Sequence, residues 1–400
     1  MTPRILIIAG SDSGGGAGIQ ADIKTVTMLG GHAMTAITAI TAQNTLGVQA
    51  LLPVPAGMVL AQINSVVTDI GVDAVKIGMI GSAETAHAVA DVLTGLKVPI
   101  VFDPVMVATS GDTLADGETI AVFARLMKLA TVVTPNLPEL EALAQIPIVR
   151  AELVEARDPA TRPSTSSGRT GEVIARTFGC AILSKGGHGD GATLTDRLVE
   201  SDGTETRWES ERIETTSTHG TGCTLASAIA TNLALGRSLE AAVAHARQFV
   251  RLALRDAPGL GNGHGPMGHQ AVRLDLGTGA RLNQVTVPTD DYAASCAFYA
   301  KLGLKQIVGT DDAHYARFEA AGGATLSVES GARPTVYFEC EDLGAEVERL
   351  QNRGVTFDQL PTDQDWLWRE ARLSDPSGNP VCLYQAGENR RYPPWRLSDA

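Results

Sequence analysis

The residues best suited to chemistry lie between Ser217 and Thr224, in the sequence STHGTGCT, directly before an apolar helical pattern at Leu225–Leu235. Small residues before a helix leave backbone amides unpaired at the positive end of the helix dipole, which favours anion binding. We expect a cysteine at such a helix start, Cys223, to have a lowered pKa and to be able to act as a general base on a substrate hydroxyl. Taken alone, the motif fits a buried structural cysteine at least as well.

Four further clusters each follow a short apolar run that is typical of a β-strand. They are Gly10–Gly18, Asp103–Met106, Asn136–Glu139 and Lys185–His188. Polar groups at the carboxyl ends of parallel strands lie where such sheets bind ligands. The spacing therefore predicts ligand contacts from these segments.

Each cluster admits a chemical and a structural interpretation. Asn136 and Glu139 could hold a hydrated Mg²⁺, or Asn136 could cap a helix that has Glu139 in its first turn, and the two roles are compatible. Lys185 could meet a nucleotide phosphate as a point charge. The loop Gly10–Gly18 lacks both the Walker A ending and the G-x-G-x-x-G spacing. It indicates only a close backbone approach or tight strand–helix packing.

Apolar runs and helical patterns alternate from residue 4 to residue 255. The runs are Ile5–Ala9, Ala74–Ile77, Ile100–Phe102, Thr131–Val133 and Ala181–Leu183. Continuous apolar strands of this kind are buried on both faces. The sequence therefore predicts an α/β fold, with a mostly parallel sheet covered by helices on both faces.

One segment interrupts this pattern. Residues 149–171 are polar and rich in Ser, Thr, Arg and Pro. We expect them to form a solvated, disordered insertion, with a functional lid as the alternative.

The pattern changes after residue 270, which we take as the end of a first domain. Residues 271–281 are expected to be a linker, residues 282–386 a second domain, and residues 387–400 a tail. The second domain has a β-α-β-β-β pattern that begins at Leu282 and again at Thr335. This repeat predicts an α+β domain built from two paired modules.

Composition excludes several classes of protein. The net charge is −13 and no basic stripe is present, which disfavours nucleic-acid binding. The five cysteines are scattered, with no C-x-x-C pair, so neither a disulfide framework nor a structural zinc site is expected. No apolar stretch is long enough to span a membrane, and the N-terminus does not have the pattern of a signal peptide. We therefore expect a cytoplasmic protein without membrane partners.

Seven motifs together carry a resemblance that no single one would. They are AGSDSGGGAGIQADIKT at Ala9–Thr25, TAQNTLGV at Thr41–Val48, KIGM at Lys76–Met79, and then DPVM, TPNLPE, KGGH and THGTGCT. In this order they resemble the hydroxymethylpyrimidine and phosphomethylpyrimidine kinases of thiamine biosynthesis, within the ribokinase-like superfamily, over residues 3–270. The insertion at residues 149–171 is the one departure, and it lies away from every matched position.

The resemblance implies a role for each matched residue. Asp22 and Gln43 would hydrogen-bond the aminopyrimidine, and Gly10, Met79 and Val105 would line its pocket. Gly220, Thr221 and Gly222 would form an anion hole, and Cys223 would be the catalytic base where most ribokinase-like enzymes have Asp. Lys185, Asn136 and Thr218 would contact ATP, and Asp103 and Glu139 would lie near Mg²⁺, with K⁺ as a further candidate ion. The resemblance also implies a homo-oligomer, with a dimer as the expected state.

The implied reaction is direct transfer of the ATP γ-phosphate to the hydroxymethyl group of a small pyrimidine. A second phosphorylation, of the monophosphate to the diphosphate, is common in this family and would use the same pocket. The alternative is a pyridoxal kinase, because close relatives share these motifs. Gln43 and its QNT context favour the aminopyrimidine.

Residues 282–386 resemble the glyoxalase/bleomycin-resistance/dioxygenase superfamily. The resemblance is carried by Val285–Val287, by FYAKLGL at Phe298–Leu304, by YFECEDL at Tyr337–Leu343 and by DPSGNPVCLYQ at Asp375–Gln385. Of the family's four metal-ligand positions, Gln284 could ligate, whereas Thr335 and Cys382 are poor ligands for a hard metal. We therefore expect a ligand-binding or dimerising module, with a metal-dependent lyase or dioxygenase as the alternative.

Overall fold

The computed structural model describes residues 2–107, 111, 114–155, 166–188, 191–274, 280–310, 314–320 and 322–397. The chain divides into two compact units, Met1–Gln270 and Ala271–Ala400. The expected linker 271–281 lies partly outside the described residues, and its first residues continue a short 3-10 helix, η2, at His269–Leu274.

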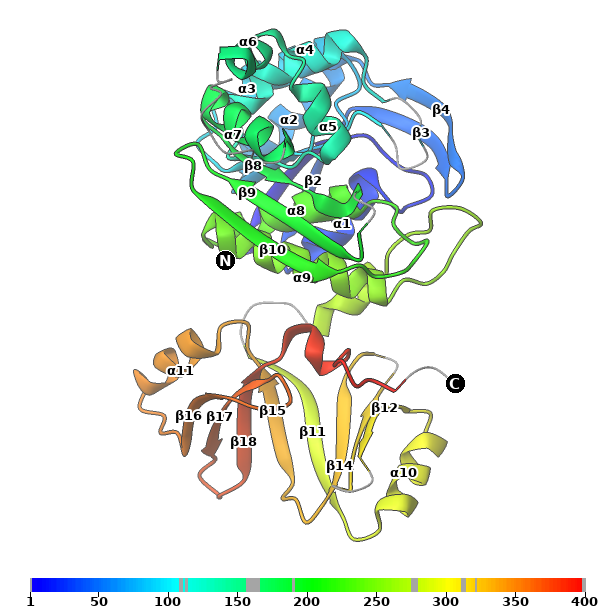
Figure 1. Ribbon diagram of the computed structural model, residues 1–400, viewed down its shortest axis with the longest axis vertical. Helices are drawn as coiled ribbons and strands as arrows, with labels where there is room; N and C mark the ends of the chain where they lie inside the picture. The colour runs from blue at the N-terminus through cyan, green and yellow to red at the C-terminus, as the bar shows by residue number, and fades with distance from the viewer. Residues whose placement is uncertain are drawn as a thin grey trace. The chain divides into compact units, whose positions relative to one another are not determined.

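The N-terminal unit is built on an eight-stranded sheet (Figure 1). Six of its strands run parallel, whereas the last two at one edge are antiparallel. In sheet order, the strands are β10 (Glu205–Glu211), β9 (Thr193–Val199), β8 (Ala181–Ser184), β7 (Val132–Val133), β6 (Ile100–Phe102), β5 (Ala74–Ile77), β1 (Arg4–Ala9) and β2 (His32–Ile37). A separate antiparallel hairpin consists of β3 (Ala39–Asn44) and β4 (Gly47–Pro53).

Helices cover both faces of this sheet, which confirms the predicted fold class (Figure 1). One face carries α1 (Gly18–Met28), α8 (Thr221–Ala234) and α9 (Leu239–Arg255). The other carries α2 (Ala56–Asp69), α3 (Ala83–Leu93), α4 (Gly117–Met127), α5 (Leu137–Leu143), α6 (Pro147–Glu155) and α7 (Ser166–Phe178).

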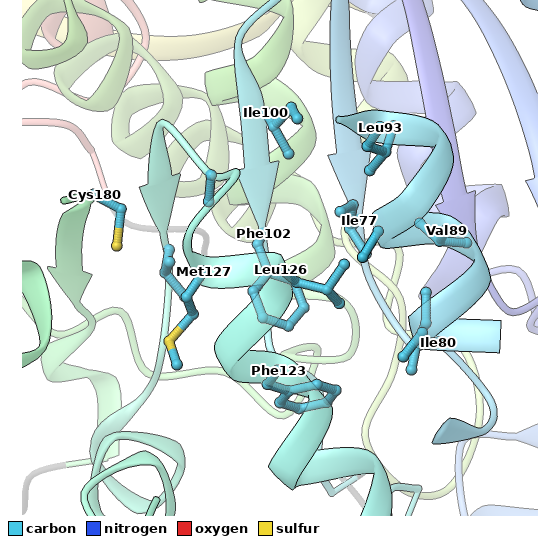
Figure 2. Packing of buried hydrophobic residues seen from close by; sticks show 14 of the residues in the cluster. Ile77, Ile80, Val89, Leu93, Ile100, Phe102, Phe123, Leu126, Met127 and Cys180 are labelled. Carbon is cyan, nitrogen blue, oxygen red and sulfur yellow. The ribbon is translucent and has the colours of Figure 1, made fainter. Parts of the chain in front are cut away.

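The core between the strands and the second helical layer is apolar and densely packed (Figure 2). Phe102 on β6 meets Phe123 on α4 edge to face, with ring centroids 5.1 Å apart. Val89 and Leu93 of α3 are fully or almost fully buried beside Ile77 of β5. Such continuous burial holds the strand ends rigidly, so the loops that follow them can be placed with precision.

Residues 149–171 are expected to be solvated and disordered, but both ends of this segment are helical and contribute buried residues. Val149 is fully buried in the core, and α6 continues through the first residues of the segment. Helix α7 begins at Ser166, and Gly171 is buried against the side chains of Ser184 and Ile182. The polar composition concealed these contacts. Residues 156–165 lie outside the described part of the chain.

The C-terminal unit is one eight-stranded sheet made of two β-α-β-β-β modules (Figure 1). In sheet order, its strands are β12 (Lys305–Thr310), β13 (Tyr315–Glu319), β14 (Thr325–Ser330), β11 (Arg281–Thr289), β15 (Thr335–Glu339), β18 (Pro380–Gln385), β17 (Arg369–Ser374) and β16 (Gln359–Asp363). Its helices are α10 (Tyr292–Lys301) and α11 (Leu343–Gln351). The two modules begin at β11 and β15, as the repeat predicts.

The expected tail does not hang free in its described part. The short helix η3 at Gly387–Arg390 follows β18, and Arg390 is fully buried against Glu339. The amide of Leu397 donates to the carbonyl of Ile307 on β12. Residues 387–397 therefore belong to the second unit, whereas residues 398–400 are outside the described chain.

Candidate active site

A pocket of about 900 Å³ lies at the carboxyl ends of the parallel strands in the N-terminal unit. Its walls come from the loops after β1, β5, β6, β7 and β8 and from the start of α8. The sequence-predicted residues that line it are Gly10, Gln43, Met79, Asp103, Val105, Asn136, Glu139, Lys185, Thr218, Gly220, Thr221, Gly222 and Cys223. The strand-end positions thus meet in one cavity.

Helix α8 begins at the pocket with an uncapped N-terminus. Its N-cap, Gly220, has the left-handed conformation (φ 80°) and provides no side-chain cap. A Cβ there would lie 1.9 Å from the carbonyl oxygen of Gly16, so the two glycine-rich segments pack backbone to backbone. Among the described residues, the amides of Gly222 and Cys223 have no hydrogen-bond acceptor. The arrangement is suited to an anion.

A lysine and two carboxylates lie beside these amides. Lys185 Nζ is 2.9 Å from Asp103 Oδ1 and 4.0 Å from Glu139 Oε2. Thr134 also donates to Asp103 Oδ1, at 2.8 Å. A Cβ on Gly222 would come within 3.1 Å of Lys185 Nζ, so the helix start and the charged cluster touch.

Glu139 has the capping role that its motif allowed. Asn136 and Glu139 form a reciprocal capping box at the start of α5, with both hydrogen bonds at 2.8 Å. Burial raises the pKa of Glu139 to about 7, and Asp103 adds to the rise, whereas Lys185 opposes it. Two carboxylates therefore share one ammonium group, and this leaves an incompletely neutralised acidic cluster in the pocket wall.

The expectation of a lowered pKa at Cys223 is wrong. Burial raises the pKa of the Cys223 thiol to about 11, and the carboxylates of Asp22 and Asp103 raise it further. Lys76 and a hydrogen bond from the Gly18 amide act in the opposite direction but are outweighed. The local effect of a helix start is thus overridden by groups that are distant in sequence.

Asp22 does not line the pocket but lies fully buried. Lys76 Nζ approaches its two carboxylate oxygens at 2.8 and 3.0 Å, and Ser227 donates to it at 2.7 Å. Burial alone would lower the pKa of Lys76, but Asp22, Cys223 and Asp103 raise it above its ordinary value, so the lysine is charged. Asp22 has its partners already, which leaves direct contact with a pyrimidine unsupported by this geometry.

Two further residues of the site, Asp12 and His219, lie within recognised motifs but had no assigned role. The carboxylate of Asp12 accepts from the amides of Gly14, Gly16 and Ala17 at 2.7–2.9 Å, and from His219 Nε2 at 3.0 Å. An aspartate three residues after the end of the strand, followed by small residues, is the available sequence signal for a loop whose amides bind a carboxylate.

The remaining predicted residues line the end of the pocket near this loop. Gln43 follows a bulge in β3, and its Nε2 lies 3.3 Å from His219 Nε2. Met79 packs on Gly10 so closely that a Cβ there would lie 2.0 Å from Met79 Cε. A larger residue at position 10 would displace the end of the Met79 side chain from this wall.

Comparison with known proteins now decides the family. The sequence model described as phosphomethylpyrimidine kinase matches residues 12–268. A hydroxymethylpyrimidine/phosphomethylpyrimidine kinase from Rhizobium meliloti is 46% identical over 272 residues, which are 67% of this chain and 97% of that protein. The chain belongs to the phosphomethylpyrimidine kinase family.

Solved structures are similar to the kinase unit. A phosphomethylpyrimidine kinase from Clostridium difficile superimposes with a TM-score of 0.51 at 35% identity, covering 63% of this chain and 98% of that one. A pyridoxal kinase from Bacillus subtilis, in complex with ADP, gives a TM-score of 0.59 at 31% identity, covering 68% of this chain and all of that one. The fold is thus shared by a phosphomethylpyrimidine kinase and a pyridoxal kinase.

The second unit belongs to another family. The model described as the Glyoxalase/Bleomycin resistance protein/Dioxygenase superfamily matches residues 281–383. Gln284 is buried and accepts a hydrogen bond from Thr325 at 2.8 Å. Thr335 donates to the carbonyl of Arg333, and burial raises the pKa of Cys382. Within the described ranges, no three His, Cys, Asp or Glu side chains group as metal ligands would.

None of the helices in the described part of the chain combines the length and the apolar character that crossing a bilayer would require.

Asp12 provides a stability test of the kinase unit. Burial opposes ionisation of Asp12, but its hydrogen bonds from His219 and the loop amides outweigh burial and lower its pKa. We expect Asp12→Asn to lower the free energy of unfolding at pH 7 by about 1–3 kcal/mol, because it removes a charged acceptor of several buried donors. Urea denaturation measures this loss.

The pH dependence has a definite sign. A lowered pKa in the fold stabilises the protein above the ordinary aspartate value of 3.8 and loses that effect as the pH falls through the folded value. The difference between wild type and Asp12→Asn should therefore narrow in acid. Asp116→Asn, at the exposed N-cap of α4, is the matched control and should cost less. If both variants lose the same free energy of unfolding at neutral pH, the hydrogen bonds that Asp12 accepts from the loop do not have the stabilising role proposed for them.

Proposed function

We propose that this chain transfers the γ-phosphate of ATP to the hydroxymethyl group of 4-amino-5-hydroxymethyl-2-methylpyrimidine, and then phosphorylates the monophosphate to the diphosphate, for thiamine biosynthesis. One observation carries the proposal. A single pocket holds two unpaired amides at the start of α8, the Lys185 ammonium, and the carboxylates of Asp103 and Glu139. These are the groups that phosphoryl transfer needs for charge stabilisation and positioning.

ATP would bind at the end of the pocket beyond Lys185. The pocket wall includes the apolar residues Leu194, Ile213, Val250 and Leu254, which suit a nucleobase. Lys185, Asn136 and Thr218 line the same pocket and would contact the phosphates. Similar kinases solved with ADP or with AMP-PCP support the choice of nucleotide.

The acidic cluster fits a magnesium ion that accompanies the nucleotide. Mg²⁺ is held in such sites by one or two carboxylates together with substrate phosphates and water. Asp103 and Glu139 would supply the carboxylates, and a bound cation would lower the pKa of Glu139, which burial raises to about 7. When bound, the ion would neutralise charge on the phosphates. The K⁺ expectation remains a prediction.

The pyrimidine would occupy the end lined by Gly10, Gln43, Met79 and Val105. Gln43 can both donate and accept, which matches the amino group and adjacent ring nitrogen of an aminopyrimidine. Asp22 would act on the reaction indirectly. It forms an ion pair with Lys76, and the charge of Lys76 lowers the pKa of Cys223.

The chemical step is a direct displacement. The hydroxymethyl oxygen attacks the γ-phosphorus, its proton passes to the Cys223 thiolate, and the bond from phosphorus to the bridging oxygen breaks to release ADP. The amides of Gly222 and Cys223, together with Lys185, stabilise the charge on the transferred group. Because the pKa of Cys223 is about 11 before ligands bind, only a small thiolate fraction is present at neutral pH.

The decisive experiment is ATP-dependent turnover of hydroxymethylpyrimidine and pyridoxal side by side. We expect a higher kcat/KM for the pyrimidine. Cys223→Ala should lower kcat by about 10²–10⁴, which is the usual contribution of a general base. A chain that turns over pyridoxal but no pyrimidine would favour the second candidate, which the likeness to pyridoxal kinase supports. A fully active Cys223→Ala variant would contradict only the role of the base.

The raised pKa of Cys223 predicts a pH profile. For wild type, kcat should rise with pH into the alkaline range, because the thiolate fraction grows toward a pKa of about 11. Cys223→Asp replaces the thiol by a carboxylate that ionises in acid, so its rising limb should move down by several pH units. Cys223→Ser, with no group that titrates in this range, is the control. If the rising limb of the kcat profile lies at the same pH in wild type and Cys223→Asp, the limb reports the titration of another group.

A homodimer and a cytoplasmic location complete the proposal. The β3–β4 hairpin exposes Ile40, Leu46 and Leu52, each more than half exposed, which is typical of an association surface. Sedimentation should give a dimer for wild type and a monomer for the double variant Leu46→Ser/Leu52→Ser. If the variant is still a dimer, the hairpin is not the dimer interface. The five free cysteines and the use of ATP are consistent with the cytoplasm.

The C-terminal unit would act as a ligand-binding or dimerising module. The alternative, a metal-dependent lyase or dioxygenase, needs a bound metal ion. Metal analysis of the full chain, with the nucleotide and free magnesium removed, separates the two: about one tightly held transition-metal ion per chain would favour the enzyme.

A further inference from the structure

The two faces of the C-terminal sheet differ in chemistry. Residues such as Phe318 and Leu383 point to one face and pack under α10 and α11. Their neighbours point to the other face. The register places Arg317, Ser327 and Thr286 side by side on β13, β14 and β11, and it places Tyr337 beside Cys382 on β15 and β18. These five residues are hereafter the polar face. All five residues are buried, although α10 and α11 pack on the opposite face.

The polar face is strongly curved. Strands β13 and β17 are five positions apart in the sheet, which would separate them by about 24 Å in a flat sheet. The Arg317 guanidinium on β13 nevertheless lies 4.9 Å from the ring centroid of Trp368, the residue before β17. Trp368 in turn stacks on Tyr384, with centroids 4.5 Å apart. The strands next to the two edges of the sheet therefore approach each other around Arg317.

The other arginines around this face have acidic partners. Arg372 pairs with Glu370 at 2.6 Å, and Arg390 lies 3.3 Å from Glu339. Two arginines of the terminal segment, Arg391 and Arg396, share Glu319.

Arg317 is the exception. Its side chain is only 4% exposed, and among the described residues no carboxylate pairs with it and no acceptor takes a hydrogen bond from it. Burial lowers the pKa of Arg317, and the charges of Arg390 and Arg396 lower it further. An arginine stays charged in proteins, so this cation is buried without a counter-ion.

We infer that the polar face of the C-terminal unit binds a small oxyanion, a carboxylate or phosphate group, with Arg317 as its counter-ion. Trp368 covers one face of the guanidinium and fixes its plane, and this leaves the edge as the direction for hydrogen bonds. A guanidinium edge donates two parallel hydrogen bonds to carboxylate or phosphate oxygens. Ser327, opposite Arg317 in the register, adds a hydroxyl to the same wall. The site is independent of the kinase pocket, which lies wholly in the N-terminal unit.

The test is calorimetric titration of the full chain with inorganic phosphate and, separately, with acetate, for wild type, Arg317→Met and Arg372→Met. We expect at least one of the two anions to bind wild type and Arg372→Met at an equivalent site. Arg317→Met should weaken this binding about thirtyfold or more, as the loss of one partner of a buried charge pair does. The preferred anion distinguishes a phosphate ester from a carboxylate ligand.

Thermal unfolding gives a second readout. Without added anion, Arg317→Met should be at least as stable as wild type, because it removes a buried charge that has no partner. Arg372→Met should be less stable than wild type, because it leaves the buried carboxylate of Glu370 without its ion-pair partner. The favoured anion should raise the unfolding temperature of wild type but not of Arg317→Met. If Arg317→Met does not fold, Arg317→Lys is the variant to titrate. It keeps the positive charge but loses the two parallel N–H donors of the guanidinium, so weaker anion binding is expected.

Some outcomes overturn the inference. These are the absence of binding by either anion, equal affinity in the Arg317 variants and wild type, or loss of the site in Lys185→Gln, which would place the anion in the kinase pocket. Phosphorylation of the pyrimidine is measured separately, so failure of the proposed kinase activity does not affect this result.

Discussion

The kinase unit depends on one buried ion pair. Lys76 comes from β5, Asp22 from α1 and Ser227 from α8, and all three side chains are fully buried. The pair therefore ties the central strand to the two helices whose starts form the pocket. Removing one partner of such a pair typically costs about 3–5 kcal/mol, because the other charge is left without compensation. The position of Cys223, one helical turn before Ser227, follows from this attachment.

The same pair sets the electrostatics of the pocket. Lys76 lowers the pKa of Cys223, whereas Asp22 and Asp103 raise it, and Lys185 then neutralises part of the charge on Asp103. Charges of alternating sign thus run from the core below Cys223 to the proposed phosphate site. A charged ligand shifts the pKa of each group in this series. The protonation of Cys223 and the binding of a cation by Asp103 and Glu139 are therefore coupled.

Sequence could predict the strands and the pocket positions because both are local signals. The runs Ala74–Ile77 and Ile100–Phe102 match β5 and β6 residue for residue. Strand-end residues then had to gather at one edge, as Asp103 and Lys185 do. Long-range contacts left no such signal. Nothing around Lys76 indicates that its partner lies 54 positions earlier.

The errors have the same origin. The lowered pKa expected for Cys223 rested on its helix start, whereas burial and two distant carboxylates decide the value. Residues 387–400 are expected from the sequence to be a tail, yet Arg390 is fully buried and pairs with Glu339. In both places the deciding partners are distant in sequence and could not be identified without the fold.

The two units can be understood through one physical rule, which is that a buried charge needs compensation. In the kinase unit, Asp103 and Glu139 face one ammonium group, so the surplus is negative and calls for a cation. In the second unit, Arg317 faces no carboxylate among the described residues, so the surplus is positive and calls for an anion. Folding tolerates such surpluses only where the rest of the structure supports them. They therefore mark binding sites more sharply than the fold does, since the same fold serves many ligands.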